Sequence, residues 1–219
     1  MSEYLAQKHT LYAQVGRVSR ALGQKTRLEI IEILAQAPRS VETIASLLQT
    51  DIKSVSQHLQ VLVETGLLTV ERKGRFRWYA VRCQEVLKLA VLLRTTAETL
   101  LGAPQTNVKD ELSLSEGLSL ARQGRLQLID VRPFEEFQSG HLAGALSMPL
   151  ASLSETITKL DSETPAAAYC RSPYCFLARQ AQEIFAKHGK TLYVLSDGVQ
   201  DWKASSPELL TVSTDSEES

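Results

Sequence analysis

Cysteine is scarce in this sequence, with Cys83, Cys170 and Cys175 the three among 219 residues. They are too few and too unevenly spaced for a disulfide scaffold, so a cysteine with a role here is expected to be reactive rather than structural. Long apolar runs are also lacking. Stretches such as 89–93 fall far short of the roughly 18 residues that cross a bilayer, and the start, MSEYLAQKHT, lacks the apolar core of a signal peptide. These absences predict a soluble, cytoplasmic protein without membrane association.

The chain as a whole has almost no excess of either charge, but its two halves do. The net charge is −1, yet residues 1–103 hold 14 Lys and Arg against 9 Asp and Glu, whereas the remainder holds 10 against 16. A basic first half and an acidic second half suggest that only the first half meets a polyanion. Hydrophobic residues make up 43% of the chain, which excludes a disordered protein and suffices for two small cores.

Composition changes at a polar stretch, GAPQTNVKDE, that contains Gly102 and Pro104. We therefore expect a first domain over 1–102, a linker over 103–111 and a second domain over 112–210. The tail 211–219 is acidic and polar, and is expected to be disordered.

The first half reads as helices followed by a hairpin. Apolar residues recur at helical spacing over 4–22 and 26–34, and Ser40 and Asp51 are suited to cap two further helices, the second ending at Gly66. Two helices joined by a tight turn at 49–50 indicate a helix-turn-helix.

The second of these helices has a polar face suited to DNA. Val55, Leu59, Leu62 and Val63 share one side, which directs them into the core. Short hydroxyl, amide and cationic groups on the remaining surface suit base edges and phosphates, although a merely solvated face is the alternative. The residues expected to bind DNA are Lys53, Ser54, Ser56, Gln57, His58 and Gln60.

The hairpin LLTVERKGRFRWYAV follows, with turn chemistry at Lys73 and Gly74. Its four cations beside aromatic residues fit a wing lying along a phosphate backbone, with an arginine able to enter a minor groove. A charged edge that only discourages aggregation is the alternative. The cations are Arg72, Lys73, Arg75 and Arg77.

These segments resemble the ArsR family of winged-helix repressors over roughly residues 10–100, most specifically in SVSQHLQVLVETGLL. The resemblance implies a homodimer that binds a palindromic double-stranded operator and represses its target. The helix 84–101 offers an apolar stripe for dimerisation, which could equally cover its own domain's core. The stripe comprises Val86, Ala90, Leu93, Ala97 and Leu100.

Metal ligands known from that family are missing from the matching helices. Residues 41–48 contain no Cys and 84–101 contain no His, so a converging ligand set is not expected in this half. His58 is expected to contact DNA or lie on the helix surface, and Cys83 is expected to be an ordinary, partly buried thiol. No metal and no cofactor is predicted.

In the second half, apolar runs alternate with amphipathic helices, which predicts an α/β domain with a parallel sheet covered on both faces. Cys170 ends the run AAAYC and opens the loop CRSPYC before a helix starting at Phe176. A helix N-terminus and the adjacent Arg171 favour a thiolate, the nucleophilic form. A buried, inert cysteine is the alternative.

This half resembles a single rhodanese domain over roughly residues 112–205, through IDVRPFEEFQSGHLAGA, the cysteine loop and DGVQDW. The resemblance implies that Cys170 accepts sulfane sulfur from thiosulfate or polysulfide as a persulfide. The loop Arg171, Ser172, Tyr174 and Cys175 would cradle the persulfide or the donor anion through backbone N–H groups. It also implies scaffold roles for Asp130, Arg132 and His141, and packing for Trp202.

Two loop positions depart from the resemblance, because Pro173 and Cys175 stand where sulfurtransferases often carry Gly and Arg. Thiosulfate turnover is therefore expected to be poor. Cys175 is either a spectator or a resolving thiol that attacks a modified Cys170. Phosphatase or arsenate-reductase chemistry is set aside, because Phe176 occupies the position of its oxyanion-binding arginine.

The two halves together predict a transcriptional repressor that senses sulfane sulfur at Cys170, the catalytic set being Cys170, Arg171 and Cys175. Modification is expected to alter domain packing and thereby operator binding. A working sulfurtransferase with a DNA-binding domain that controls its own synthesis is one alternative. An arsenite or soft-metal sensor using both loop cysteines is another.

Overall fold

The computed structural model describes residues 3–102, 110–161 and 163–212. The chain forms two compact units, Met1–Leu92 and Leu93–Ser219, which are described separately. Most of the expected linker, 103–109, lies outside the described residues. In the part of the chain that is described, no helix has both the length and the apolar character that a membrane crossing demands.

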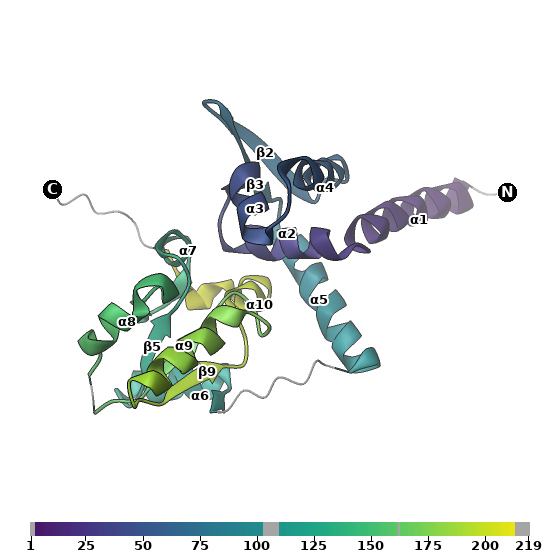
Figure 1. Ribbon diagram of the computed structural model, residues 1–219. Helices are drawn as coiled ribbons and strands as arrows, with labels where there is room; N and C mark the ends of the chain where they lie inside the picture. Colours follow the sequence, from purple (N-terminus) through teal and green to yellow (C-terminus); the bar gives the residue numbers. More distant parts are fainter. Residues whose placement is uncertain (1–2, 103–109, 162, 213–219) are drawn as a thin grey trace. The chain divides into compact units, whose positions relative to one another are not determined.

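The first unit is built mainly from helices. Its first four are α1 Glu3–Leu22, α2 Lys25–Gln36, α3 Val41–Leu48 and α4 Ile52–Glu64. Only Ala21 and Leu22 of α1 are buried, and the helix extends away from the rest of the unit (Figure 1). The core is formed by α2, α3 and α4, with Ile30, Ile31 and Ile44 fully enclosed.

The helix-turn-helix forms as the sequence predicts, because its end signals are satisfied locally. The Ser40 side chain accepts a hydrogen bond from the Thr43 N–H, and the Asp51 carboxylate accepts one from the Ser54 N–H. Gln49 ends α3 in the left-handed conformation at φ 51°. Gly66 follows α4 at φ +79°, the conformation that favours glycine after a helix.

A three-stranded antiparallel sheet completes this domain, in the order β1-β3-β2. Strand β2, Leu68–Lys73, pairs with β3, Phe76–Val81, to form the expected wing. Lys73 pairs with Phe76, so the turn residues are Gly74 and Arg75, one position later than the Lys73 and Gly74 of the sequence prediction. The two-residue strand β1, Arg39–Ser40, was not predicted.

Helix α5 has the predicted bounds, Gln84–Leu101, and contains the boundary between the two units. Its expected apolar stripe divides in two. Val86 and Ala90 are buried, whereas Leu93 and Leu100 are 41% and 76% exposed. The first half of the stripe therefore serves a core, and the second half is left on the surface.

The second unit contains a five-stranded parallel sheet in the order β4-β9-β8-β5-β7, as the alternating pattern predicts. Its strands are β4 Glu111–Leu112, β5 Gln127–Asp130, β7 Leu146–Ser147, β8 Ala166–Tyr169 and β9 Leu192–Leu195. A separate antiparallel pair joins β6 His141–Leu142 to β10 Leu210–Thr211.

Helices cover both faces of this sheet (Figure 1). On one face, α8 and α9 enclose a core that includes Ile129, Ala168 and Cys170. On the other face, α6 and α10 enclose Leu128, Tyr169 and Trp202. The helices are α6 Leu114–Arg122, α7 Phe134–Gln138, α8 Leu153–Thr156, α9 Phe176–Lys187 and α10 Val199–Ser205, with 3₁₀ turns at Leu150–Ser152, Ile157–Lys159 and Pro207–Leu209.

Two residues near the expected ends of this domain pair in strands. Glu111, assigned to the linker, pairs with Val194 in the sheet. Thr211, assigned to the disordered tail, pairs with His141. Both residues gain backbone partners from distant parts of the chain, which composition does not reveal. The rest of the expected tail, 213–219, lies outside the described residues.

Candidate functional site

The outward face of α4 is the first candidate surface. Val55, Leu59 and Leu62 are completely buried, so the opposite side of the helix is fixed in the core. All six residues that the sequence assigns to DNA contact reach the surface of this helix. Four are exposed and two are half-buried: Lys53, Ser56, Gln57 and Gln60, then Ser54 and His58.

Two of these side chains already make hydrogen bonds within the helix. The Ser56 hydroxyl donates to the Ile52 carbonyl oxygen at 2.8 Å, and the Gln60 Nε2 donates to the Glu64 Oε1 at 2.8 Å. Contact of Ser56 or Gln60 with DNA must share or replace these bonds.

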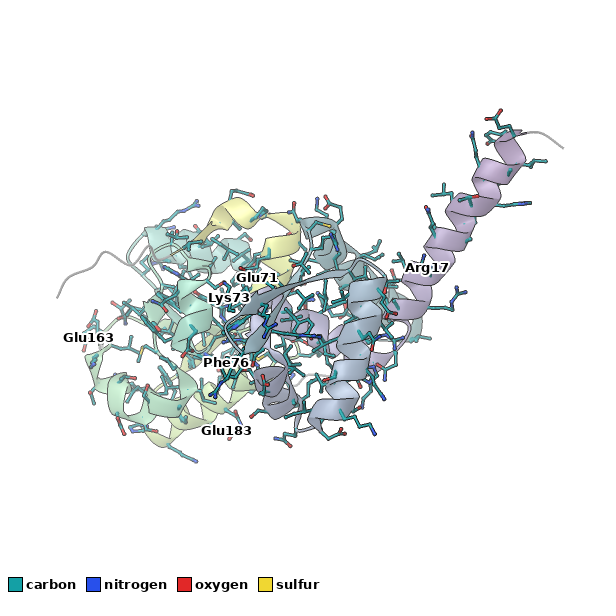
Figure 2. The ribbon with its side chains drawn as sticks, turned by 90° about the horizontal axis from the view of Figure 1, so that it is seen from above. Arg17, Glu71, Lys73, Phe76, Glu163 and Glu183 are labelled. Carbon is teal, nitrogen blue, oxygen red and sulfur yellow. A yellow bond between two sulfur atoms is a disulfide. The ribbon has the colours of Figure 1, made fainter. Side chains whose placement is uncertain are left out.

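The wing places its cations in solvent. Arg72, Lys73, Arg75 and Arg77 are all exposed. Lys73 Nζ lies 3.4 Å from Glu71 Oε2, and Figure 2 labels both residues with Phe76 at the end of the hairpin. Such an exposed ion pair contributes little, so it does not prevent Lys73 from meeting a phosphate. The Arg75 guanidinium lies 4.9 Å from the centre of the Phe76 ring.

A metal centre does not form among residues 3–102, 110–161 and 163–212, because no three His, Cys, Asp or Glu side chains gather there. Cys83 is exposed, so the expectation that its thiol is partly buried is wrong. His58 is half-buried on α4. The soft-metal alternative for Cys170 and Cys175 therefore lacks a third ligand of these types within the same residues.

The second candidate site is the loop between β8 and α9. Strand β8 ends at Tyr169, one residue earlier than the predicted strand, which ended with Cys170. Helix α9 starts at Phe176, as predicted. Cys170 is 3% exposed and belongs to the apolar core on the α8 and α9 face of the sheet.

Cys170 and Cys175 are joined by a disulfide, with their Cα atoms 6.1 Å apart. This separation is normal for a disulfide. The two side chains of the loop can therefore meet, which spacing in the sequence could not decide. In this form the Cys175 N–H donates to the Ser172 carbonyl oxygen at 3.1 Å, so one predicted cradle donor is engaged within the loop.

The start of α10 and the glycine before it contact the backbone of the cysteine loop. The Val199 N–H donates to the Cys170 carbonyl oxygen at 3.0 Å, and the Gln200 N–H donates to that of Arg171 at 2.9 Å. A Cβ on Gly198 would lie 2.4 Å from the Ser172 Cα. Gly198 lies in the motif DGVQDW, whose sequence does not reveal this contact.

The three expected scaffold residues lie beside one another in the buried region after β5. Arg132 and Asp130 are both fully buried. The Arg132 guanidinium donates through Nε to Asp130 Oδ1 at 2.9 Å, and through Nη2 to Asp130 Oδ2 at 2.6 Å and to the Gly140 carbonyl oxygen at 2.7 Å. His141 stacks on Phe137 at 3.7 Å between ring centres. These contacts join β5, α7 and β6.

Arg171 does not extend into solvent beside the cysteine. Its guanidinium donates to both carboxylate oxygens of Glu136, from Nη2 at 2.6 Å and from Nε at 3.0 Å. Glu136 is 1% exposed. The pair compensates the charge of Arg171, which weakens the predicted stabilisation of a Cys170 thiolate by that residue. Glu136 was missed as a site residue because its partner lies 35 positions away.

Two further groups near this network have shifted pKa values. Burial, aided by the negative charge of Asp130, raises the pKa of Tyr169 well above its usual range. The Tyr169 ring packs edge-on against Trp202 at 5.1 Å, which places Trp202 in the core as expected. Burial and the positive charge of Arg132 lower the pKa of Lys203 to about 8, against the opposing effect of Glu136.

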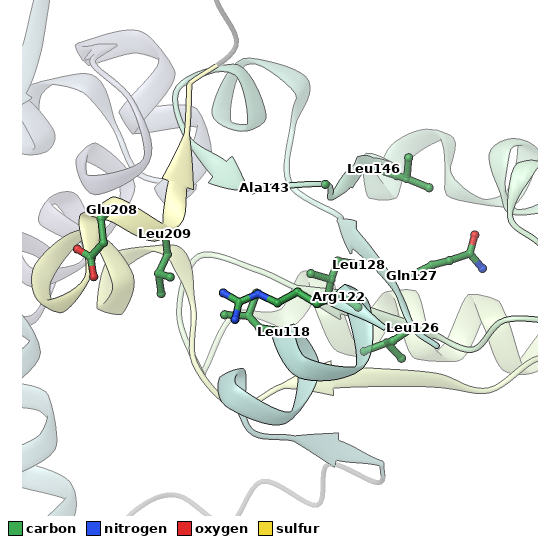
Figure 3. A pocket seen from close by; sticks show the side chains of 11 residues that line it. Leu118, Arg122, Leu126, Gln127, Leu128, Ala143, Leu146, Glu208 and Leu209 are labelled. Carbon is green, nitrogen blue, oxygen red and sulfur yellow. The ribbon is translucent and has the colours of Figure 1, made fainter. Parts of the chain in front are cut away.

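A cavity of about 470 Å³ lies elsewhere in this domain (Figure 3). Leu118, Arg122 and Leu128 line it from α6 and β5, and Leu209 closes one side. It adjoins the amino-terminal half of β5, whereas Cys170 follows the carboxyl end of β8. The cavity is therefore separate from the cysteine loop.

Two families match separate parts of the chain. The Helix-turn-helix domain family matches residues 22–71, from the end of α1 into the wing. The Rhodanese-like domain family matches residues 113–205, from the cap of α6 to the end of α10. Each match falls on one of the two candidate sites.

Similar proteins match either most of the chain or its second half. HTH-type transcriptional regulator Rv0324 of Mycobacterium tuberculosis is 33% identical over 207 residues, which cover 90% of each chain. Thiosulfate sulfurtransferase GlpE of Coxiella burnetii is 31% identical over 99 residues, 44% of this chain and 90% of that one.

Among solved structures, the homodimeric winged helix-turn-helix DNA-binding domain, fragment 1–100, of Mb0332 from Mycobacterium bovis is 32% identical. It covers 49% of this chain and 97% of its own, with a TM-score of 0.43. The relationship to Rv0324 extends through both domains. The chain belongs to the family of HTH-type transcriptional regulators that includes Rv0324, with a helix-turn-helix domain followed by a rhodanese-like domain.

Proposed function

We propose that this regulator represses transcription as a cytoplasmic homodimer on a palindromic operator, and that Cys170 accepts or senses sulfane sulfur. One observation carries the proposal. A DNA-reading domain is linked covalently to a rhodanese-like loop whose two cysteines, Cys170 and Cys175, are within bonding distance. Because the two domains are in one chain, a chemical change at the cysteine loop can alter DNA binding and thereby transcription.

The charges of the first domain support binding to DNA. Exposed wing cations flank Gly74, and Lys53 and Gln57 are exposed on α4. Cations along the wing supply affinity for phosphates in any sequence. Amide and hydroxyl groups on α4 supply the hydrogen bonds that distinguish base pairs in the major groove.

Exposed apolar side chains support the homodimer. Leu11, Tyr12 and Val15 of α1 are 57%, 63% and 49% exposed. Leu93 and Leu100 add apolar surface on α5. Burying such surfaces against a second copy removes them from water, and a twofold dimer matches the two halves of a palindrome.

The proposed sulfur step begins from the reduced loop. The Cys170 thiolate attacks the sulfane sulfur of a donor such as thiosulfate or polysulfide, forming a new bond from its Sγ. The donor's S–S bond breaks, and its electron pair leaves with sulfite or with the shortened polysulfide. Cys170 is left as a persulfide.

Cys175 then has a chemical role that the disulfide supports. Its thiolate attacks the Sγ of the Cys170 persulfide, and the outer sulfur leaves as hydrosulfide with the bond's electron pair. The product is the Cys170–Cys175 disulfide, the form that this structure describes. A dithiol reductant returns both thiols.

Operator affinity tests the proposal directly. Fluorescence anisotropy with a labelled operator measures Kd for the fully reduced full-length protein before and after polysulfide treatment. We expect Kd to change about tenfold, within the usual range of coupling between two sites. Cys170→Ser should abolish this change. Cys83→Ser removes the exposed third cysteine and is the matched control that should retain it.

Mass spectrometry of the peptide that carries both loop cysteines identifies the chemical state in the same samples. A persulfide adds one sulfur, and the internal bridge removes two hydrogens. Cys175→Ser should accumulate the persulfide. Identical operator affinities in all states of the wild type would overturn the regulatory part of the proposal.

A working sulfurtransferase with autoregulatory DNA binding is the second candidate. The similarity to thiosulfate sulfurtransferase GlpE over 99 residues favours it. Rapid turnover of thiosulfate and cyanide, together with operator binding that is insensitive to sulfur species, would select this function.

A further inference from the structure

We infer that Glu136 determines which sulfur donor the loop accepts. By compensating Arg171, it favours organic persulfides, whose transferable sulfur carries no sulfonate, over dianionic thiosulfate. This inference deepens the proposed function and rests on sulfur transfer to Cys170. Glu136 acts here as a positioning residue, because it works through Arg171 rather than on the donor.

The geometry commits the Arg171 guanidinium to the protein. It meets Glu136 at two oxygens, with Nη2–Oε1 at 2.6 Å and Nε–Oε2 at 3.0 Å. The Glu136 side chain is 1% exposed, and that of Arg171 is 16% exposed. Because this bidentate ion pair is largely removed from water, its attraction is screened little. The Arg171 Nε–H and Nη2–H donors are already occupied by the Glu136 carboxylate. A sulfonate would have to displace Glu136 to obtain the same contact.

Arg132, another cation of this region, is also held by the protein. Arg132 donates to the Asp130 carboxylate and to the Gly140 carbonyl oxygen, and is fully buried. The Lys203 side chain packs near Gly140. Arg179 lies one turn into α9.

The loop opening is aromatic rather than cationic. Cys175 stands at the sixth place of the loop, half-buried, with half-buried Tyr174 before it and Phe176, 73% exposed, after it. These side chains offer apolar contact to the organic part of a donor. Asp197 precedes Gly198, whose Cα packs against Ser172, which adds an acidic residue to this neighbourhood.

The electrostatic difference between donors acts in the transfer step. When the Cys170 thiolate attacks the outer sulfur of R–S–SH, the new bond forms to that sulfur and the thiolate RS⁻ leaves with the electron pair. With thiosulfate the leaving group is sulfite. Thiosulfate itself is a dianion, so a doubly negative donor must approach the negatively charged thiolate. A compensated Arg171 gives little relief of that repulsion.

The test measures persulfide formation at Cys170 in reduced full-length protein, using thiosulfate and glutathione persulfide as separate donors. Stopped reactions analysed by mass spectrometry give a second-order rate for each. For the wild type we expect the second-order rate with glutathione persulfide to be about tenfold or more above the rate with thiosulfate. A tenfold ratio corresponds to about one screened interaction between two charges. Glu136→Gln keeps the side-chain shape and frees the charge of Arg171. It should raise the thiosulfate rate relative to glutathione persulfide about tenfold.

Three variants separate charge from structure. Glu135→Gln removes the adjacent exposed carboxylate and should keep the wild-type ratio. The gain of Glu136→Gln should vanish in Glu136→Gln/Arg171→Gln and persist in Glu136→Gln/Arg179→Gln. Should Glu136→Gln fail to fold, Cys175→Arg supplies a cation at the loop opening and must also raise the thiosulfate rate.

The outcomes distinguish this inference from the function beneath it. An unchanged donor ratio in Glu136→Gln, with both donors still modifying Cys170, overturns the inference and leaves the proposed function standing. A gain that requires Arg179 rather than Arg171 also overturns it. If neither donor modifies Cys170 in the wild type, the proposed function and the inference fail together.

Discussion

The Gly198 backbone packs directly against Ser172, so closely that a Cβ on Gly198 would lie 2.4 Å from both the Cα and the N of Ser172. The conflict is with backbone atoms, which cannot rotate away as a flexible side chain does. The position of the cysteine loop therefore depends on the absence of a side chain at this residue.

Gly198→Ala should displace the loop and destabilise the rhodanese-like domain by about 1–3 kcal/mol, the usual cost of overpacking. Its φ of −125° suits any residue, so the effect comes from the contact alone. Urea unfolding and the rate of Cys170 persulfidation measure both consequences. Gly189→Ala is not a suitable control, because Gly189 has φ +67°. Ser205→Ala, at the end of α10, is preferable, and equal stability of the two variants would contradict the steric argument.

Asp130→Asn should lower stability by about 3–5 kcal/mol, because it leaves the fully buried Arg132 without its compensating charge. The measurement is the free energy of unfolding in urea at pH 7. Glu135→Gln is the matched control, since Glu135 is exposed and should change stability very little. A small effect of Asp130→Asn would mean that Arg132 keeps its other contacts and tolerates the loss.

Arg75→Ala combined with Arg77→Ala should weaken operator binding and lower its salt dependence. Each lost phosphate contact reduces the slope of log K against log salt by about 0.9. Titrations at several salt concentrations with operator and with unrelated DNA give this slope. Binding to both DNAs should weaken similarly, because phosphates carry no sequence information. Arg125→Ala, an exposed cation of the second domain, is the control.

Lys203 should make stability depend on pH. Its pKa is lowered to about 8 in the folded protein, mainly by burial, from 10.5 in the unfolded chain. Between these values the unfolded state binds more protons, so stability rises as pH increases from about 8 to about 10.5. Below pH 8 the full penalty of a buried charge is present. Lys203→Met should remove this slope when unfolding curves of the two proteins are compared, and parallel curves would contradict the shifted pKa.

Leu11→Glu should dissociate the proposed dimer, because it places a charge within the exposed apolar face of α1. Light scattering after size-exclusion chromatography should give the monomer mass, with a weaker affinity for a two-half-site operator. Gln14→Glu introduces the same charge on the same helix and should leave the dimer intact. A dimeric Leu11→Glu would exclude this face from the interface.

Local signals in the sequence predicted the elements that depend on local chemistry. Ser40, Asp51 and Gly66 were identified because caps and the left-handed conformation have strong residue preferences. The strand before Cys170 and the helix at Phe176 followed from apolar patterning. The two-residue strands such as β1 and β6 were missed, because a segment that short shows no periodicity.

The contacts of the cysteine loop could not be predicted from local sequence signals, because they join residues far apart in the chain. Glu136 and Glu135 are adjacent and alike, yet only Glu136 faces Arg171. Likewise, the spacing of Cys170 and Cys175 does not determine the direction of their side chains. The stripe on α5 was found, but its division into buried and exposed halves depends on where the neighbouring helices end.

Each domain contains one of the two tryptophans, so the fluorescence of each domain can be followed separately. Trp78 lies in the wing strand β3, whereas Trp202 contacts the ring of Tyr169, the residue immediately before Cys170. Indole fluorescence responds to changes in its immediate surroundings, so Trp78→Phe leaves a reporter of sulfur chemistry and Trp202→Phe leaves one of operator contact. Time-resolved fluorescence of these two variants after addition of a sulfur donor shows whether the surroundings of Trp202 change before those of Trp78.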